Sequence, residues 1–382
     1  MPAAVKYVLI PDKFKGSLSA TQVRDAVSQG LRFHDPHAEI KGFAASDGGD
    51  GFLEAIRAVR AVEPVTTEAC DALGRAIRAE FLYDPEHQEA FVEMAVASGM
   101  AQLDPQERDP LVTTTRGTGI QIREAIGLGA RKVFVGLGGS ATTDGGTGIA
   151  HEFGFRFLDG EGKRLEPVGG SLEHIRGIEV PPPGVRAGVE VLAVNDVTNP
   201  LWGPQGAAHV YGPQKGADPE AVEALDRGLR NLDRQVQRHL ARDTASVPGA
   251  GAAGGTAYGL QVFLDASFVA GTSFLFGISG VEAALRESPP DYLITGEGRI
   301  DEQSLQGKVV QGALELGKRF GIPVLAVCGR CDADRDSLRQ AGLAEVIEVS
   351  DRQRPLAWNM EHAFERTRQA VAHYFEGIRK QP

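Results

Sequence analysis

Short apolar runs alternate along the chain with segments in which apolar residues recur every three or four positions. The recurring pattern is typical of amphipathic helices. Uninterrupted runs of Val, Ile and Leu are typical of strands covered on both faces of a parallel sheet. Strands are predicted over the ranges 5–10, 40–44, 91–94, 133–135, 189–194, 292–295, 324–327 and 346–349. This alternation predicts an α/β fold with mainly parallel sheets.

Two of the predicted helices have clear start signals. Ser19 and Gln22 have the spacing of a capping box for a helix that runs towards Phe33. Asp218 and Pro219 supply an N-cap and a proline at the first helical position. One long amphipathic helix should follow this proline. Its apolar positions are Val222, Leu225, Leu229, Leu232, Val236 and Leu240.

The strands at both ends of the chain have the same character, which predicts that the two ends fold together. The middle of the chain is then a second α/β domain inserted into the first. Turn-rich sequence near 84–90 and the glycine-rich region 249–259 guide the boundaries. We expect residues 1–88 plus 265–382 to form a discontinuous Rossmann-like domain and residues 89–264 to form the inserted domain.

Composition and charge narrow the class of protein. The chain has 382 residues, of which 42% are hydrophobic and 24% charged, as in ordinary soluble proteins of two or three domains. A formal net charge of −11 argues against a general nucleic-acid or anionic-membrane binder. No window approaches the roughly 20 apolar residues of a membrane span, and no signal-peptide layout is present at the start. These features predict no nucleic-acid or membrane partner.

Cysteine usage predicts a reducing compartment. The chain has three cysteines, Cys70, Cys328 and Cys331, which is too few for a disulfide framework and fits a cytoplasmic location. Cys328 and Cys331 match a C-x-x-C spacing. The sequence offers neither a thioredoxin-like helix after them nor a second pair for zinc, so they are predicted to pack at a strand end.

One polar loop reads GLGGSATTDGGTG at 136–148 and directly follows the predicted strand 133–135. Its glycines allow backbone N–H groups to approach a ligand closely. Hydroxyl side chains can join those N–H groups around phosphate oxygens. They belong to Ser140, Thr142, Thr143 and Thr147. Asp144 adds a hard oxygen ligand of the kind that Mg²⁺ prefers. The loop is therefore predicted to bind phosphate.

Two early segments carry further candidates. PDKFKGS at 11–17 places Lys13 and Lys15 beside a helix start, where ammonium groups and free N–H groups together make an anion site. SDGGDG at 46–51 places Asp47 among glycines, which suits Mg²⁺ binding or general-base catalysis. Because ligands of open α/β sheets bind beyond the carboxyl ends of strands, these loops are candidates for one shared cleft.

Three later segments carry the remaining candidate site residues. Asp196 stands directly after the strand 189–194, where a carboxylate can take a proton from a hydroxyl or bind a metal ion. Lys215 is a compact cation able to reach a phosphate. In TGEGRID at 295–301, acidic side chains could hold a metal ion and the arginine could neutralise a carboxylate or phosphate. Turn formation or helix capping remains the alternative for Asp50, Asn195, Asn199 and Asp301.

The inventory of acids, cations and backbone donors matches phosphoryl transfer, which needs positioning, charge stabilisation, Mg²⁺ and one base. Neither a G-x-S-x-G elbow nor a zinc-type histidine pair occurs in the sequence. Gly307-Lys308 is followed by valine, so it is not a Walker A loop. The chemistry therefore fits a kinase, but not one of the two commonest kinase designs.

Several motifs in family order resemble the bacterial glycerate kinase family, type I, across nearly the whole chain. They are PDKFKGS (11–17), SDGGDG (46–51), GLGGSATTDGG (136–146), NDVTNPLWGPQGAA (195–208), YGPQKGA (211–217), PGAGAAGG (248–255) and TGEGRID (295–301). The resemblance implies two α/β domains with the active site in the cleft between them. It also implies Mg²⁺ and ATP-dependent phosphorylation of D-glycerate, with 2-phosphoglycerate as the expected product. It leaves the oligomeric state open, a homodimer included.

The resemblance supports a set of predicted roles. Lys13, Lys15, Ser17 and Arg299 are predicted to bind glycerate. Gly138, Gly139, Ser140, Thr142, Thr143 and Lys215 are predicted to bind the nucleotide. Asp196, Asp47 and Lys13 are the catalytic candidates, and Asp144, Asp47, Glu297 and Asp301 are the candidates for Mg²⁺. Which carboxylate is the general base stays open.

A dinucleotide-dependent oxidoreductase acting on a small hydroxy acid is the strongest alternative. Gly136, Gly138 and Ala141 fit G-x-G-x-x-A after a strand, and Asp159 lies about 20 residues on, where a ribose-binding acid would stand. That fingerprint normally runs straight into a helix, whereas TTDGG at 142–146 is poor helix sequence. A non-enzymatic binding module could use the same glycines, but it would not need so many carboxylates.

Overall fold

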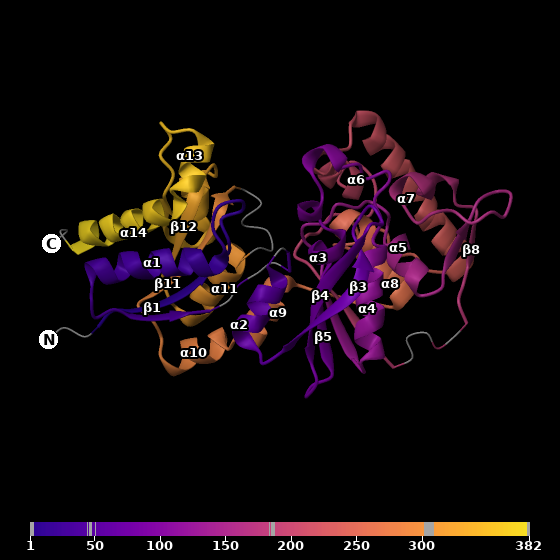
Figure 1. The fold of residues 1–382 in the computed structure, drawn as a ribbon. Coiled ribbons are helices and arrows are strands. Elements are labelled where there is room, and N and C mark those ends of the chain that lie inside the picture. Colours follow the sequence, from indigo (N-terminus) through magenta and orange to yellow (C-terminus); the bar gives the residue numbers. More distant parts are fainter. Residues whose placement is uncertain are drawn as a thin grey trace. The chain divides into compact units, whose positions relative to one another are not determined.

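The computed structural model describes residues 4–43, 45, 48–49, 51–182, 184, 188–301 and 309–379. The chain divides into two compact units. The first unit consists of Met1–Ser46 and Thr272–Pro382, and the inserted unit is Asp47–Gly271. The two ends of the chain thus belong to one unit (Figure 1).

The first unit is built on a five-stranded sheet in which every pair is parallel. The strand order is β13-β12-β11-β1-β2. The strands are β1 (Lys6–Pro11), β2 (Glu39–Gly42), β11 (Tyr292–Ile300), β12 (Val324–Cys331) and β13 (Leu343–Glu348). β1 and β11, from opposite ends of the chain, lie side by side near the centre of this sheet.

Helices cover both faces of this sheet. They are α1 (Ala20–His34), α9 (Gly271–Ser279), α10 (Val281–Glu287), α11 (Val309–Phe320), α12 (Arg335–Ala341), α13 (Leu356–Glu361) and α14 (Ala363–Arg379). Tyr7 and Leu9 of β1 pack in one core with α1 and α14, which lie side by side (Figure 1). Val8 and Ile10 pack in another core with α10 and α11. The uninterrupted apolar run of β1 therefore serves two cores.

The inserted unit has a six-stranded sheet in the order β10-β9-β6-β5-β4-β3. These strands are β3 (Glu63–Cys70), β4 (Ala76–Asp84), β5 (Glu89–Glu93), β6 (Lys132–Gly136), β9 (Glu190–Val194) and β10 (Ser267–Val269). β5, β6, β9 and β10 are parallel, whereas β3 and β4 form an antiparallel extension beside β5. A small antiparallel pair joins β7 (Arg156–Leu158) to β8 (Gly177–Glu179).

The helices of the inserted unit are α2 (Phe52–Val59), α3 (Met94–Ser98), α4 (Arg116–Gly127), α5 (Thr147–Glu152), α6 (Ala207–Tyr211), α7 (Pro219–Leu240) and α8 (Ala252–Leu264). Short 3₁₀ turns lie at Met100–Gln102, Pro105–Glu107, Gly169–His174 and Pro213–Lys215. The buried stripe of α7 joins one large core with α4, α5 and α8. On the other face of the sheet, the ring of Phe91 stacks on that of Phe134 with centroids 5.1 Å apart.

The structure confirms the α/β class, the predicted strands and both helix starts. Ser19 caps α1 through a complete capping box, and Asp218 caps α7 by accepting a hydrogen bond from the Ala221 N–H. The boundaries of the insertion differ from those predicted. Residues 51–88 lie in the inserted unit, because the β3–β4 hairpin is hydrogen-bonded to β5. The insertion also ends at Gly271, because β10 pairs with β9.

Within the described residues, no helix combines the length and the apolar character that a membrane crossing requires.

Candidate functional site

Glycine-bearing loops meet where the parallel strands of the inserted unit end. Three backbone hydrogen bonds join them: Gly138 N–H to Gly48 O (3.3 Å), Leu137 N–H to Val194 O (3.1 Å) and Gly145 N–H to Gly254 O (3.1 Å). The approach at Gly254 requires glycine, because a Cβ there would lie 2.0 Å from the carbonyl oxygen of Thr142 and φ is +68°. The segments around 48, 137–146, 194 and 254, separate in the sequence, therefore form one structural cluster.

Lys215 brings a positive charge into this cluster. Its Nζ donates hydrogen bonds to Ser140 Oγ (2.9 Å) and Thr142 O (2.6 Å), and the residue is only 2% exposed. Burial lowers the pKa of the Lys215 ammonium to about 7, and the nearby Asp144 carboxylate opposes this shift. Lys215 and Ser140, predicted to bind the nucleotide, are thus in direct contact.

Two hydroxyls of the same loop lack partners. Thr142 and Thr143 are fully buried, and neither Oγ1 atom has a hydrogen-bond partner. The side-chain amide nitrogen of Asn195, after β9, is also buried without a partner. Buried polar groups are normally hydrogen-bonded, because leaving one unpaired costs about 1–3 kcal/mol. Hydroxyls without partners, in a loop that also contacts the Lys215 ammonium, suit an anion with several oxygens.

Asp144 has a structural role in the inserted unit. Its fully buried carboxylate accepts four hydrogen bonds, from the N–H and hydroxyl of Thr115 (2.8 Å each) and from the N–H groups of Gly146 (3.0 Å) and Gly148 (3.1 Å). Burial raises the pKa of the Asp144 carboxyl, and these hydrogen bonds oppose the shift. Backbone and hydroxyl donors already contact the carboxylate, which anchors the start of α5, and the predicted Mg²⁺ role of Asp144 stays a prediction.

Replacing Asp144 by asparagine should lower the free energy of unfolding by about 3 kcal/mol, because an amide leaves some of these buried donors unpaired. Urea unfolding measured by circular dichroism would test this. Asp159→Asn is the matched control. Asp159 accepts hydrogen bonds from the Glu161 and Lys163 N–H groups in a turn that asparagine also suits. Unchanged stability of Asp144→Asn, together with weakened Mg²⁺ binding, would contradict the structural role and favour Asp144 as a metal ligand.

Asp196 follows β9 at the same strand ends and is half-buried. The end of β9 is fixed by a hydrogen bond from the Asn195 N–H to the carbonyl oxygen of Val269 (3.1 Å). Asp196 is therefore close in the chain to Val194, whose carbonyl oxygen belongs to the loop cluster, and its role as a base stays a prediction. Asp47 lies outside the described residues, so its catalytic and metal roles stay predictions.

In the first unit, the lysine loop meets the TGEGRID segment. The Asp12 N–H donates to Gly296 O (2.8 Å), and a Cβ on Gly298 would lie 3.1 Å from Lys15 N. The turn is closed by a hydrogen bond from the Ser17 hydroxyl to Phe14 O (3.1 Å). Two predicted ligand segments, distant in the sequence, are therefore neighbours within this unit.

The charged side chains of this neighbourhood differ in exposure. Lys15 is exposed, Lys13 and Ser17 are half-buried, and Glu297 is buried. The Arg299 guanidinium lies 2.8 Å from an Asp332 oxygen and 3.9 Å from an Asp301 oxygen. Arg299 thus forms an ion pair with Asp332, a residue that the sequence had not singled out.

The positions of the acidic side chains show how the described residues could bind Mg²⁺. Over the described ranges, no three His, Cys, Asp or Glu side chains cluster closely enough to hold a metal ion. Mg²⁺ is usually bound by one or two carboxylates together with substrate phosphates and water, so this arrangement still fits a metal that arrives with a nucleotide. Glu297 and Asp301 remain the described candidates for that contact.

Arg108 is a neighbour of the phosphate loop that sequence reasoning missed. Its Nη2 donates to Met100 O (3.3 Å), and Met100 N–H in turn donates to Gly139 O (2.9 Å). Its buried Nε has no hydrogen-bond partner. A Cβ on Gly216, next to Lys215, would lie 2.0 Å from Arg108 O. Arg108 follows no predicted strand or glycine motif, so only the fold identifies it.

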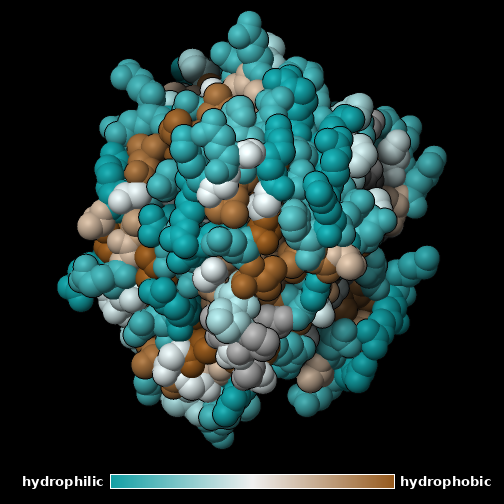
Figure 2. All heavy atoms as spheres, turned by 90° about the vertical axis from the view of Figure 1, so that its right-hand side faces the viewer, coloured by the Kyte–Doolittle hydropathy of each residue, from teal (hydrophilic) through white to brown (hydrophobic). Residues whose placement is uncertain are grey.

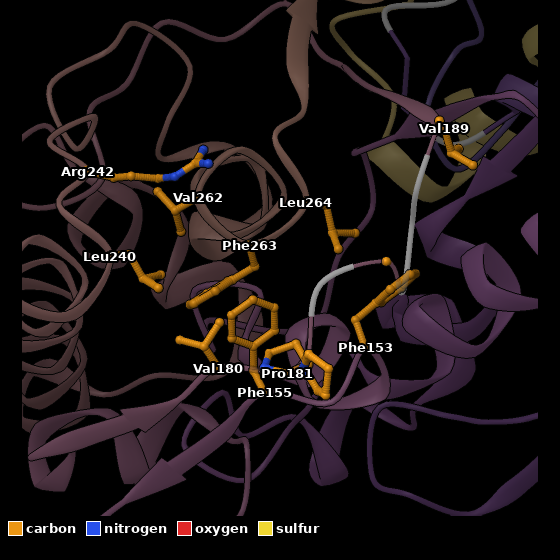
Figure 3. Close-up of a pocket in the computed structure, with 13 residues that line it drawn as sticks. Phe153, Phe155, Val180, Pro181, Val189, Leu240, Arg242, Val262, Phe263 and Leu264 are labelled. Carbon is orange, nitrogen blue, oxygen red and sulfur yellow. The ribbon is translucent and has the colours of Figure 1, made fainter.

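A cavity of about 540 Å³ in the inserted unit is lined mainly by apolar side chains, including Phe153, Phe155 and Phe263, with Arg242 at one side (Figure 3). Val180 in its wall is 55% exposed. The face seen in Figure 2 is mostly hydrophilic, with hydrophobic side chains gathered near its middle. None of the predicted site residues lines this cavity. Because its lining is mainly apolar, this cavity does not suit phosphate. The candidate site is therefore assigned to the glycine-bearing loops at the strand ends.

Buried Lys215, the partnerless hydroxyls and the glycine loops at parallel strand ends define an α/β protein of the phosphate-handling class. The chain belongs to the glycerate kinase family, whose model matches residues 7–379. It is 35% identical to a glycerate kinase of Bacillus subtilis over 375 residues, covering 96% of this chain and 97% of that protein. It is 37% identical to a glycerate 2-kinase of Escherichia coli over 346 residues, covering 90% of each.

A solved structure gives the same result. The crystal structure of a proposed glycerate kinase 2 from Salmonella typhimurium LT2 matches with a TM-score of 0.79 and 36% identity, covering 99% of both chains. The oxidoreductase alternative is not supported. α5 begins only at Thr147, well after the glycines, and Asp159 accepts hydrogen bonds within a turn. The chain therefore matches the dinucleotide fingerprint in the spacing of its residues, but not in the structure that the fingerprint normally adopts.

Proposed function

We propose that this protein transfers the γ-phosphoryl group of ATP to the 2-hydroxyl of D-glycerate and releases 2-phosphoglycerate and ADP. The observation that carries the proposal is the contact of the buried Lys215 ammonium with Ser140, in a loop whose Thr142 and Thr143 hydroxyls have no partners. The relative named glycerate 2-kinase supports the choice of hydroxyl. A need for ATP fits a location in the cytoplasm, as does the small number of cysteines.

The proposed roles follow from charge and position. Ser140, Thr142, Thr143 and Lys215, with the N–H groups of Gly138 and Gly139, hold the phosphates. Lys13 and Lys15 hold the substrate carboxylate, because ammonium groups beside a helix start favour anions. Asp196 accepts the hydroxyl proton as the oxygen attacks the phosphorus atom. Bound Mg²⁺ would neutralise phosphate charge, with Glu297 and Asp301 as its carboxylate contacts.

One assay tests the reaction and its position. The enzyme is incubated with Mg-ATP and D-glycerate, and phosphorus NMR separates 2-phosphoglycerate from 3-phosphoglycerate. We expect 2-phosphoglycerate and ADP in equal amounts. The 3-isomer would overturn the choice of hydroxyl alone. No ATP consumption with D-glycerate or any related hydroxy acid would overturn the kinase proposal and favour a binding module.

Lys15→Ala should raise the KM for D-glycerate about tenfold with little change in kcat, because an exposed ammonium binds substrate and transition state nearly equally. Steady-state kinetics with glycerate varied at saturating ATP measures this. Lys41→Ala, at an exposed lysine of β2, is the control and should behave as wild type. A changed KM for ATP in place of glycerate would move Lys15 to the nucleotide side.

A further inference from the structure

A buried carboxylate lies at the carboxyl end of β5 in the inserted unit. Glu93 is the last residue of this strand and is only 8% exposed. In the sequence it interrupts an otherwise apolar run that includes Phe91, Val92 and Met94. Acidic side chains are rarely buried without a partner, so the contacts of Glu93 should show why it is retained at this position.

The partners of Glu93 are backbone groups of the first turn of α2. One carboxylate oxygen accepts a hydrogen bond from the Gly51 N–H and the other accepts one from the Leu53 N–H, each at 3.0 Å. Gly51, the N-cap residue, has a φ of +87° and no side chain with which to cap the helix. Glu93, 40 residues beyond Leu53 in the chain, therefore supplies the acceptors that this helix start requires.

Two further contacts extend this attachment. The ring of Phe52 in α2 packs against that of Phe91 in β5, with centroids 6.4 Å apart, and both residues are fully buried. The Phe52 N–H donates to Gly49 O (3.1 Å), which joins the first turn of α2 to the glycines before it. The end of β5 therefore holds both the helix start and the backbone that leads into it.

The backbone that leads into α2 lies against the start of the glycine-rich loop. Gly48 O accepts the Gly138 N–H (3.3 Å), and a Cβ on Gly136 would lie 2.8 Å from the same oxygen. A Cβ on Gly48 would lie 2.8 Å from Val194 O, at the end of β9. Gly136 is also the register partner of Glu93 in the β5–β6 pair. These close approaches leave little room for Gly48 to move without displacing the loop.

Given the proposed function, on which this inference rests, we propose that Glu93 is a positioning residue for the glycine-rich loop at 136–148. Its carboxylate fixes the N–H groups of Gly51 and Leu53, the backbone of that turn fixes Gly48, and Gly48 fixes the start of the loop. Glu93 itself does not contact the nucleotide. Phosphate donors that must be placed accurately are sensitive to small shifts, because a displacement of about 1 Å can lower a rate about 10²-fold.

Glu93→Gln in the full-length protein tests the proposal. Glutamine keeps the size of the side chain, but it offers an N–H donor where the second backbone N–H needs an acceptor. We expect kcat/KM for ATP to fall about 10–100-fold, with the KM for D-glycerate nearly unchanged. Steady-state kinetics with each substrate varied in turn measures this. Wild-type ATP kinetics in folded Glu93→Gln would overturn the proposal.

Asp84→Asn is the matched control, because Asp84 is also a buried carboxylate that accepts two backbone N–H groups, those of Glu86 and His87. It lies before the other end of β5. Both variants should unfold at lower urea concentration than wild type, but only Glu93→Gln should change the ATP kinetics. An equal loss of kcat/KM in Asp84→Asn would overturn the proposal, because it would show a general effect of lower stability.

Hydrogen exchange measured by mass spectrometry gives a readout that does not depend on turnover. In Glu93→Gln, peptides that contain Leu53 and Gly138 should exchange faster than in wild type, whereas Asp84→Asn should leave them unchanged. If wild type fails to phosphorylate D-glycerate, the proposed function is wrong, yet faster exchange at Gly138 would still support the link from Glu93 to the loop. Unchanged exchange at Gly138 in Glu93→Gln would overturn that link even in an active kinase.

Discussion

Replacing Asp196 by asparagine is expected to lower kcat by a factor of about 10²–10⁴, the range that general-base catalysis contributes. The residue follows β9, whose end is tied to β10 by the hydrogen bond from the Asn195 N–H to Val269 O. Asparagine keeps the size of the side chain but cannot accept a proton from the substrate hydroxyl. The fold and both KM values should change little.

Steady-state kinetics and thermal unfolding of Asp196→Asn measure these effects together. Asp218→Asn is the matched control in the same unit. Asp218 caps α7, and asparagine caps helices as well as aspartate does. The control should keep wild-type kcat and stability. A near-normal kcat for Asp196→Asn would remove Asp196 from the catalytic set and leave Asp47 as the base candidate.

The second large effect is expected at Lys215. Lys215→Met should lower kcat/KM for ATP by about 10²–10³, because loss of one preorganised donor to developing phosphate charge has this cost. The proposed role needs the charged form of Lys215, whose pKa is about 7. Wild-type kcat/KM should therefore fall as pH rises above about 7, and this decline should be absent in the variant. Lys163→Met, at an exposed lysine of the same unit, should retain the wild-type profile.

The free energy of unfolding of wild type should change with pH in the direction opposite to kcat/KM. The pKa of Lys215 is about 7 in the folded protein, against 10.5 for an unperturbed lysine. Between these values the unfolded chain binds the proton more tightly, so wild-type stability should rise with pH across that window. The free-energy advantage of Lys215→Met over wild type should be largest below pH 7 and shrink towards pH 10.5. Urea unfolding across this range measures it, and a pH-independent difference would contradict the assigned pKa.

Much of the fold can be predicted because its central strands are buried on both faces. The run at 133–135 is apolar throughout, and the run at 189–194 is apolar except for Glu190; they become β6 and β9. β3 is different, since most of its residues are exposed or half-buried at the edge of its sheet, and its sequence reads as mixed polarity. The insertion boundary was misplaced for the same reason, because β3 carries no continuous apolar run and the hairpin that it forms with β4 was not predicted.

The site can be predicted less completely, because the sequence shows residue types but not which side-chain atoms are already hydrogen-bonded within the protein. Asp144 has the composition of a metal ligand, yet four donors from its own and a neighbouring loop surround it. Lys215 was identified from its motif, but its burial, which sets its pKa, depends on packing. Arg108 lies in a segment without any pattern and reaches the loop only through the fold.

The discontinuous first unit has a consequence for the order of folding during synthesis. Thr295 of β11 and Ile10 of β1, joined by a hydrogen bond, are 285 residues apart in the chain. On a ribosome, the whole insertion emerges before β11, so its own sheet can close while β1, which pairs with both β2 and β11, still lacks one of its two neighbours. Domains generally fold as units during translation, and distant strand pairing is slow. The strand made first therefore joins its sheet fully only after the insertion is made, and β1 keeps an open edge until β11 has emerged.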